Sequence, residues 1–417
     1  MPEAPAHLGD PLELTLGAPA SGGGFVARAD DGRVVFVRHG LPGERVLATL
    51  TESHARWARA DAIEILAPST ERVTPPCAAA GPGRCGGCDY QHASLAAQRR
   101  FKALALEEQL RRVAKLERAV EVEAYGDTGL GTRTRLRFGV AEDGTLGMRQ
   151  RASTELYAVE GCPLGVEEIG QADLAAERYP AGHDVEVVAL VPGEPALVAL
   201  VEWTDEDPDP TDASFEAEDA GTEESSSGLR TVSVTLAQDS YRVSPGSFFQ
   251  IHRQAPHVLV DAVLDGLRAR EGEHVLDLYA GVGLFSAPLA RAVGTSGVVV
   301  AVESAPTAAA DARANLAAFT QAQVVDDPVR SSTLGEIAAG AVAAVLDPPR
   351  AGVDKGVLEA LIEEPTMERI VLVSCNPATF ARDLKILLDA GFELMTLRAL
   401  DLFEMTEHLE IVASLRR

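Results

Sequence analysis

The sequence predicts an α/β protein of three units: a small β-barrel, a central α+β unit and a carboxyl-terminal doubly wound domain. Two observations predict the last unit. Apolar strands alternate with helices from about residue 255, and a glycine turn, Gly281-x-Gly283, follows the first of these strands. A third observation predicts the barrel, because residues 11–66 contain short strands separated by glycine-rich turns. The expected domain boundaries are 1–70, 71–250 and 251–417.

The first unit and the helix after it follow from local patterns. The expected barrel strands are 13–16, 24–29, 33–38, 44–50 and 60–66. Asp31-Gly32 is a hairpin signal between two of them. Residues 94–114 then show apolar residues at helical spacing and a strongly basic polar face. Solvent or an anionic partner explains that face equally well, so the sequence leaves both open.

Arginines alternate in the segment RTRLRF, which places Arg133, Arg135 and Arg137 on one face of an expected strand. A second expected strand, after the turn EDGT, carries Arg149 and Arg151. Like charges side by side repel each other unless an anionic group shares the face. The pattern therefore predicts a sheet that contacts phosphates.

Charge is distributed unevenly along the chain. The formal net charge is −26, which by itself argues against a nucleic-acid partner. Residues 1–160 are nearly balanced, however, with 20 Lys or Arg against 21 Asp or Glu, so this part is expected to meet a polyanion. Residues 202–228 hold 11 acidic residues and no basic one, which predicts a disordered insertion or an extended loop.

The glycine turn indicates a nucleotide-like ligand. Its glycines let the backbone approach that ligand, and Glu303, at the end of the second strand, is placed to bind ribose hydroxyls. Asp277 leads the turn, and Ser286 stands where a dinucleotide fingerprint has its third glycine. The segment therefore favours S-adenosylmethionine over a dinucleotide. The strands expected in this unit are 274–279, 298–303, 341–347 and 370–375, with helices from 284, over 306–318 and after 376.

The segment LDPPRAG ends a further strand with Asp347. Enzymes that methylate exocyclic amines carry an aromatic residue after the two prolines. This chain has Arg350 there, which argues against an amine acceptor. Asp347 is then either a carboxylate near the switch point of the sheet or a simple strand cap.

Cys375 follows an apolar strand and precedes an expected helix, NPATFARDL. The amino end of a helix favours a thiolate, although a buried, inert cysteine is the plainer alternative. A thiolate beside a methyl donor has one obvious use. It adds to C6 of a pyrimidine, which makes C5 nucleophilic enough to take the methyl group. Glu410, in the carboxyl-terminal segment, is the candidate base for the C5 proton.

The other four cysteines, Cys77, Cys85, Cys88 and Cys162, supply the four thiolates of a zinc site or a [4Fe-4S] cluster. Structural zinc usually takes two short pairs of ligands, so a spacing of three plus one leans toward iron and sulfur. The alternatives are a set of small buried cysteines or disulfides. The sequence shows no signal peptide and no apolar run of about 18 residues, so we expect a reducing, cytoplasmic location and no membrane partner.

Taken together in their order, the segments SCNPATFARDL, LDPPRAG, DLYAGVG, SFFQIH and HLE and the cysteine set resemble the uracil-5 RNA methyltransferase family. The resemblance spans about residue 11 to the end. It implies an amino-terminal TRAM domain (an OB-like barrel) that binds RNA, a [4Fe-4S] cluster and a class I methyltransferase domain. Two departures stand out, because His252 occupies a position where Asn is common and Glu404 replaces a usual Pro.

The resemblance also implies roles for individual residues. Cys375 is the nucleophile, Glu410 the proton acceptor and Asp347 a contact to the flipped uracil or the cofactor. The cluster ligands are Cys77, Cys85, Cys88 and Cys162. The cofactor-binding positions are Gln250, Tyr279, Gly281, Gly283, Glu303, Asp327 and Asp347.

The function expected from these patterns is methylation of C5 of a uridine in structured RNA, ribosomal or transfer, by a monomeric enzyme that uses S-adenosylmethionine. The alternative is a non-catalytic RNA-binding or RNA-folding module on the same fold. Cys375 and Glu410 argue against that module, since it has no need of either residue.

Overall fold

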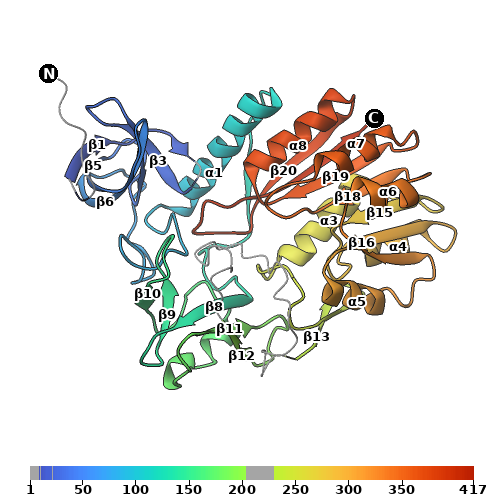
Figure 1. Ribbon diagram of the computed structural model, residues 1–417, viewed down its shortest axis with the longest axis horizontal. Coiled ribbons are helices and arrows are strands. Elements are labelled where there is room, and N and C mark those ends of the chain that lie inside the picture. The colour runs from blue at the N-terminus through green and yellow to red at the C-terminus, as the bar shows by residue number, and fades with distance from the viewer. Residues whose placement is uncertain (1–8, 10, 21, 203–229) are drawn as a thin grey trace.

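The computed structural model describes residues 9, 11–20, 22–202 and 230–417. Figure 1 shows three regions around the long helix α1 (Leu95–Gln109): an amino-terminal sheet, a central sheet and a carboxyl-terminal α/β region. Most of the acidic tract expected at 202–228 lies outside the described residues.

The amino-terminal region is a six-stranded sheet in the order β1-β5-β6-β4-β3-β2. Its strands are β1 (Pro11–Thr15), β2 (Pro19–Ala20), β3 (Gly24–Arg28), β4 (Val34–Arg38), β5 (Arg45–Ser53) and β6 (Trp57–Ala67). The hairpin expected at Asp31-Gly32 is confirmed, because β3 pairs with β4 around Gly32, whose φ is 88°. The sheet curls around a core that contains Phe25, Val37 and Phe101.

The expected β-barrel is wrong in one respect, because the sheet does not close. Its two edge strands, β1 and β2, are not hydrogen-bonded to each other among the described residues. The chain runs from β1 into β2 through only three residues, Leu16 to Ala18, and β2 itself has two residues. One of those is Pro19, which lacks an N–H, so the edge has few donors for a closing ladder.

The central region is a five-stranded sheet in the order β10-β9-β8-β11-β12, preceded along the chain by the π-helix η1 (Leu110–Ala114) that continues α1. The strands are β8 (Arg135–Val140), β9 (Leu146–Arg149), β10 (Leu156–Ala158), β11 (His183–Val188) and β12 (Leu197–Glu202). Two short helices, α2 (Glu167–Gly170) and η2 (Leu174–Ala176), cover one side. All pairings in this sheet are antiparallel.

The carboxyl-terminal region is an eight-stranded sheet in the order β17-β16-β15-β18-β19-β21-β20-β7. Its strands are β7 (Val122–Ala124), β15 (His274–Leu278), β16 (Val298–Glu303), β17 (Ala322–Asp326), β18 (Ala343–Leu346), β19 (Arg369–Ser374), β20 (Glu393–Asp401) and β21 (Glu410–Arg416). The five from β17 to β19 are parallel, and their residues are almost all apolar in β18 and β19, as expected for a sheet covered on both faces. β21 runs antiparallel between β19 and β20.

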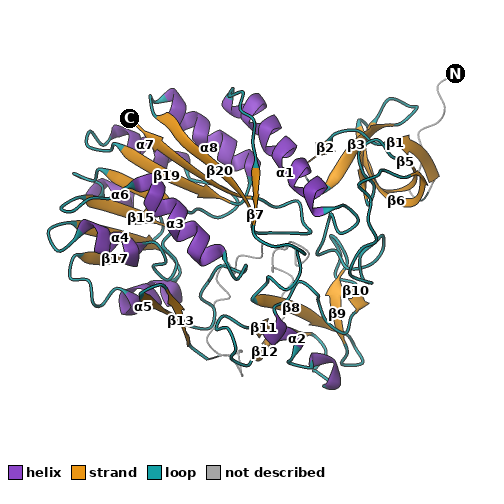
Figure 2. Ribbon diagram, turned by 180° about the vertical axis from the view of Figure 1, so that it is seen from behind, coloured by secondary structure: helices purple, strands orange, loops and turns teal. Residues whose placement is uncertain are grey.

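Helices cover both faces of this sheet (Figures 1 and 2). They are α3 (Ala255–Leu267), α4 (Ser286–Val293), α5 (Pro306–Asn315), α6 (Ser331–Ile337), α7 (Lys355–Glu363) and α8 (Pro377–Asp389). A hairpin of β13 (Val232–Leu236) and β14 (Asp239–Val243) packs into the same core as α3 and α4. No described helix has both the length and the apolar character needed to cross a bilayer.

Helix α1 joins the amino-terminal and carboxyl-terminal regions. Ala97 and Phe101 pack into the core under the amino-terminal sheet, whereas Ala103 and Leu106 pack into the core of the carboxyl-terminal sheet. The short strand β7 then adds to that sheet beside β20, as Figure 2 shows. Residues before 251 therefore complete the carboxyl-terminal sheet.

Candidate active site

The predicted site residues gather at one edge of the eight-stranded sheet. Tyr279, Glu303 and Asp347 end or directly follow β15, β16 and β18, and Cys375 directly follows β19. The strands are parallel, so these ends lie side by side, and backbone bonds link them: Asp347 N donates to Leu278 O at 3.3 Å. This is the carboxyl edge, where open α/β sheets bind ligands.

The glycine turn leaves open space above its backbone. Gly281 has a φ of 54°, and a Cβ built on it meets no atom within 4 Å. Its N–H donates to Glu303 Oε2 at 2.8 Å, while Ala305 N donates to Glu303 Oε1 at 2.7 Å. Glu303 thus holds the turn and keeps its carboxylate at the mouth of the site. Gly283 has a φ of 85°, a conformation that non-glycine residues rarely adopt.

Three other residues of the predicted cofactor-binding set, Tyr279, Asp327 and Gln250, differ in their surroundings. Tyr279 has a φ of 65°, a strained conformation for a residue with a side chain, and such strain is concentrated at functional sites. Burial raises the pKa of Tyr279 to about 12, so its hydroxyl keeps its proton. Asp327 is exposed and accepts a hydrogen bond from Thr333 Oγ1 at 2.7 Å. Gln250 is half-buried, and the next residue, Ile251, accepts bonds from Thr134.

Asp277 and Asp347 form a pair of interacting carboxyls at the base of the turn. Asp277 is fully buried and accepts a bond from Ser286 Oγ at 2.5 Å. Burial raises the pKa of Asp277 to about 7. Burial and the nearby Asp277 also raise the pKa of Asp347, which keeps some solvent exposure. At neutral pH the pair therefore retains a proton that an ordinary aspartate would have lost.

The strand register brings Cys375 and Glu410 together across 35 residues of sequence. β19 and β21 are antiparallel, and their register ends with the pair of Ser374 and Ile411. Cys375 is the next residue after Ser374, and Glu410 is the residue before Ile411, so both lie at the same end of these two adjacent strands. Both residues are buried, at 9% and 4% exposure.

The immediate surroundings of Cys375 match the expected strand-to-helix junction. Asn376 caps α8, because its Oδ1 accepts a bond from Ala378 N at 2.9 Å. The amino end of this 13-residue helix therefore lies beside the thiol and favours an anion there. His408, two residues before Glu410, is held neutral, since burial and the charge of Arg350 lower its pKa to about 4.

The four other cysteines converge from two segments. Burial, with smaller contributions from the charges of Cys162 and Cys77, raises the pKa of Cys85 to about 11, so these thiols interact electrostatically. Burial likewise raises the pKa of Cys88. In the part of the chain that the structure describes, however, no three His, Cys, Asp or Glu side chains are arranged as metal ligands.

Protein groups around these thiols suit an anionic sulfur centre. Gln91 Nε2 donates to Cys88 Sγ at 3.1 Å, and Gly87 N donates to Cys85 Sγ at 3.4 Å. Arg133 lies close enough to lower the thiol pKa values, and its buried Nη2 has no hydrogen-bond partner among the described residues. A cation with a spare donor fits a set of thiolates.

The arginine face expected to contact phosphates is an internal ion-pair network, which corrects that prediction. Arg137 Nε lies 2.7 Å from Asp184 Oδ2, and Arg149 donates both terminal nitrogens to the same carboxylate. Arg135 Nε forms an ion pair with Glu186 Oε1 at 2.5 Å. The strand β11 pairs with β8 and places its acids on the arginine face. The anionic groups that share the arginine face are therefore side chains of this chain, Asp184 and Glu186, and not phosphates.

The structure adds polar residues that sequence patterns missed. Gln98 and Lys102 are buried on α1, and Lys102 forms an ion pair with Asp401, 299 residues away. The only signal in the sequence was their position on the apolar face of the expected helix, next to Phe101.

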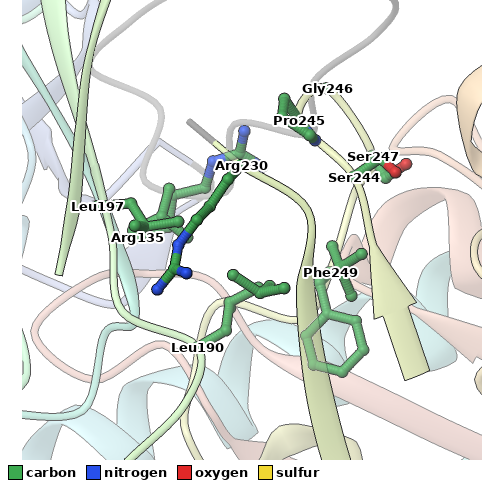
Figure 3. A pocket seen from close by; sticks show the side chains of 12 residues that line it. Arg135, Leu190, Leu197, Arg230, Ser244, Pro245, Gly246, Ser247 and Phe249 are labelled. Carbon is green, nitrogen blue, oxygen red and sulfur yellow. The ribbon is translucent and has the colours of Figure 1, made fainter. Parts of the chain in front are cut away.

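A small cavity lies between the central sheet and the β13–β14 hairpin (Figure 3). Arg135, Leu190 and Phe249 are among its lining residues. Its volume is about 30 Å³. The cavity borders the segment that carries Gln250 and is separate from the glycine turn.

A doubly wound sheet with an open glycine turn, an acid after the second strand and further polar residues at the carboxyl edge defines the methyltransferase class of nucleotide-binding folds. The sequence matches the family profile of tRNA (Uracil-5-)-methyltransferase over residues 333–417 and that of the TRAM domain over 5–63. Residues 234–327 match the profile of protein-L-isoaspartate(D-aspartate) O-methyltransferase.

Relatives match nearly the whole chain. "Uncharacterized RNA methyltransferase SCO5901" of Streptomyces coelicolor is 40% identical, over 98% of this chain and 93% of its own length. The 23S rRNA (uracil(1939)-C(5))-methyltransferase RlmD of Shewanella sp. strain MR-7 is 31% identical, over 92% and 90%. The chain belongs to the RNA (uracil-5-)-methyltransferase family.

A solved structure shares the fold. The tRNA (uracil-54, C5)-methyltransferase of Pyrococcus abyssi, in complex with S-adenosyl-L-homocysteine, superimposes with a TM-score of 0.68 at 24% identity. The match covers 96% of this chain and 99% of the other. The arrangement of the three regions is therefore that of a known RNA methyltransferase fold.

Proposed function

We propose that the protein methylates C5 of a uridine in structured RNA through a covalent adduct between Cys375 and C6. The observation that supports this proposal most is the register of β19 and β21, whose last pair, Ser374 with Ile411, adjoins Cys375 on one strand and Glu410 on the other. A nucleophile and a base at one sheet edge suit a reaction that needs both on one pyrimidine ring.

The residues act in sequence. The Cys375 thiolate adds to C6, and the electron pair of the C5–C6 double bond moves to C5, which becomes nucleophilic. S-adenosylmethionine, when bound, supplies the methyl group that C5 takes from its sulfonium. Glu410 then removes the C5 proton, the C5–C6 double bond forms again, and the bond between C6 and Cys375 breaks. The thiolate and the methylated uridine are restored.

The cofactor has a fitting place at the carboxyl edge. Gly281 leaves room for a ligand against the backbone, and Glu303 offers carboxylate oxygens to ribose hydroxyls. Asp347 retains a proton near neutrality and can donate it in a hydrogen bond to a carbonyl oxygen of the flipped uracil. The remaining cofactor contacts that we propose are Gln250, Tyr279, Gly283 and Asp327.

We also propose that Cys77, Cys85, Cys88 and Cys162 hold a [4Fe-4S] cluster. The mutual effect of these thiols on their pKa values, the donors to Sγ from Gln91 and Gly87, and the unpartnered Nη2 of Arg133 support it. The cluster would brace the loop that contains Cys85 and Cys88, and the proposed methylation chemistry has no step that uses it.

RNA is proposed to bind along the amino-terminal region. On the outer face of β6, Trp57 stacks on His54 with ring centroids 4.0 Å apart, and the guanidinium of Arg59 lies 5.3 Å from the Trp57 ring. Phe36 meets the same ring edge-on from β4. Aromatic and cationic groups that are interleaved on an accessible sheet suit unpaired bases and phosphates.

The test uses RNA that carries 5-fluorouridine, from which the C5 substituent cannot leave as a proton. Wild-type protein with S-adenosylmethionine should form an adduct that resists denaturant, whereas Cys375→Ala should form none while still binding the cofactor. Ribosomal and transfer RNA transcripts are compared, because the Shewanella relative is named for a ribosomal RNA substrate and the solved structure for a transfer RNA substrate. Normal methylation by Cys375→Ala would refute the mechanism. RNA binding without any methylation by wild type would favour the non-catalytic module.

A further inference from the structure

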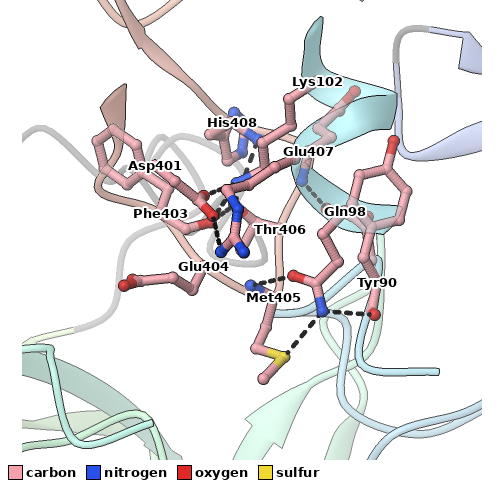
Figure 4. A network of polar contacts seen from close by, with 12 residues as sticks. Tyr90, Gln98, Lys102, Asp401, Phe403, Glu404, Met405, Thr406, Glu407 and His408 are labelled. Atoms are coloured by element: carbon pink, nitrogen blue, oxygen red, sulfur yellow. Dashed lines mark hydrogen bonds and ion pairs between the residues drawn. The ribbon is translucent and has the colours of Figure 1, made fainter. Parts of the chain in front are cut away.

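The loop between β20 and β21, residues 402–409, is held mainly by the amino-terminal half of the chain. In Figure 1 it extends from the carboxyl-terminal sheet toward α1. The backbone of Met405 is the centre of this attachment: its N–H donates to Gln98 Oε1 at 3.0 Å, and its carbonyl accepts from Asp89 N and Tyr90 N, both at 2.9 Å (Figure 4). Met405 has a φ of 66°, so these bonds hold a strained residue.

Gln98 is itself fixed from behind. Its Nε2 donates to Tyr90 O at 3.1 Å and to Ala93 O at 3.0 Å, and the side chain is fully buried. The amide therefore has one orientation, with its oxygen directed at Met405 N. A buried amide with all of its partners in place specifies a single geometry.

A second anchor lies one turn along α1. Lys102 Nζ donates to Asp401 Oδ1 at 2.6 Å and to Phe403 O at 2.9 Å. Both charged side chains are completely buried. Such pairs seldom add net stability relative to apolar packing, and their best-attested use is to specify one arrangement. Here they fix where the loop begins.

A third anchor comes from the cysteine loop. Asp89 directly follows Cys88, and its Oδ2 accepts a bond from Glu407 N at 3.1 Å. The loop is thus held at its start, its middle and its end by residues 89–102.

The loop ends one residue before Glu410. Glu410 is the first residue of β21 and pairs with Leu400 of β20, so its backbone is held on one side by the sheet and on the other by the path of the loop. Cys375 is positioned independently, by β19 and the cap of α8. The anchors therefore affect the position of Glu410, the proposed base, and not the position of Cys375, the proposed nucleophile.

We propose that Gln98 and Lys102 are positioning residues for Glu410, so that the step that removes the C5 proton depends on α1 being docked against the loop. The inference rests on the proposed function. It predicts a specific kinetic signature: a loosened loop slows proton removal and release of the RNA, whereas attack by Cys375 and transfer of the methyl group proceed nearly as before.

The experiment follows a single turnover with methyl-labelled cofactor and uridine RNA. Two rates are measured, the formation of the methylated, denaturant-resistant adduct and its decay to free RNA. Gln98→Met keeps the size of the side chain and removes its hydrogen bonds. Adduct formation should stay within about threefold of wild type, while decay slows by roughly 10- to 100-fold, as expected for a misplaced catalytic group. Gln98→Glu keeps the acceptor for Met405 N and should recover part of the decay rate.

The matched control is Gln109→Met, on the same helix and not bonded to the loop. It should leave both rates unchanged. The positioning role is refuted if Gln98→Met slows formation and decay of the adduct equally, or if its adduct decays at the wild-type rate. Lys102→Met provides an independent test, with the folded fraction measured by circular dichroism, and the folded molecules should show the same selective delay.

The outcome separates this inference from the proposed function. If neither wild type nor Glu410→Gln forms an adduct with any RNA, the proposed function fails and the inference fails with it. If Glu410→Gln accumulates methylated adduct while Gln98→Met does not, the proposed function stands and only the positioning role is overturned.

Discussion

His252 Nε2 lies 3.4 Å from Glu404 Oε1, although 152 positions separate the two residues, and both side chains are almost fully buried. Burial opposes ionisation of Glu404, but its interaction with the nearby His252 outweighs that effect, so the pKa of Glu404 is below its ordinary value. His252 and Glu404 are two of the positions at which the chain departs from the family pattern that it otherwise resembles. The two departures are therefore one contact, which ties the segment before α3 to the loop before Glu410.

This contact should appear as coupling between the two residues. We expect His252→Asn and Glu404→Gln each to lower the free energy of unfolding. The double variant should lose less than the sum of the two, with a coupling of about 0.5–3 kcal/mol. Urea unfolding of the four proteins measures it. Additive losses would contradict a direct interaction.

Glu410→Gln should trap the reaction after methyl transfer. The variant retains Cys375, so the adduct forms, but it lacks the carboxylate that takes the C5 proton. We expect methylated RNA bound covalently to the protein and visible as a shifted band in a denaturing gel. Glu393→Gln, an exposed position at the start of β20, is the control and should turn over normally. Release of product by Glu410→Gln at the wild-type rate would assign the base to another group.

Arg137→Gln should destabilise the protein and should not weaken RNA binding by folded molecules. Asp184 is fully buried and would lose one of its two cationic partners, at a cost of about 2 kcal/mol. Arg178→Gln removes an exposed arginine and should change stability little. The measurements are thermal unfolding and an RNA titration at several salt concentrations. Unchanged stability together with a reduced salt dependence would restore the phosphate-contact interpretation.

Cys88→Ser should remove iron. Protein purified without oxygen should be brown and contain about four irons per chain, and the variant should lose colour and stability. Cys375→Ala is the control and should keep its iron, because Cys375 lies at the edge of the other sheet. Stoichiometric zinc without iron would refute the cluster and leave the proposed methylation untouched.

In the cofactor-free protein, the free energy of unfolding should depend on pH in part because of Asp277. Its pKa in the folded chain, about 7, is above the ordinary value of 3.8, so the folded state holds the proton more tightly than the unfolded state. The stability from this group is present below about pH 4 and is lost as pH rises through 7. Relative to wild type, Asp277→Asn should therefore gain stability over this window, whereas the exposed Asp261→Asn should not. A difference between wild type and Asp277→Asn that does not vary with pH would show that the carboxyl is not buried with its proton.

The sequence by itself determined the parts that depend on local pattern. Continuous apolar strands followed by polar residues placed Glu303, Asp347 and Cys375 at strand ends, and parallel strands necessarily bring such ends to one edge. The helix at 94–114 and the hairpin at Asp31-Gly32 followed from spacing and turn chemistry in the same way.

Only the tertiary structure decided which distant groups meet. The sequence showed that the arginine face needs anions, but the pairing of β8 with β11 decided that Asp184 and Glu186 supply them. The insertion of β21 between β19 and β20 brought Glu410 and Cys375 to the same end of adjacent strands, and the docking of α1 buried Lys102 against Asp401. Periodicity records which face of an element is buried. It does not record which element covers that face, because this depends on contacts between residues that are tens to hundreds of positions apart.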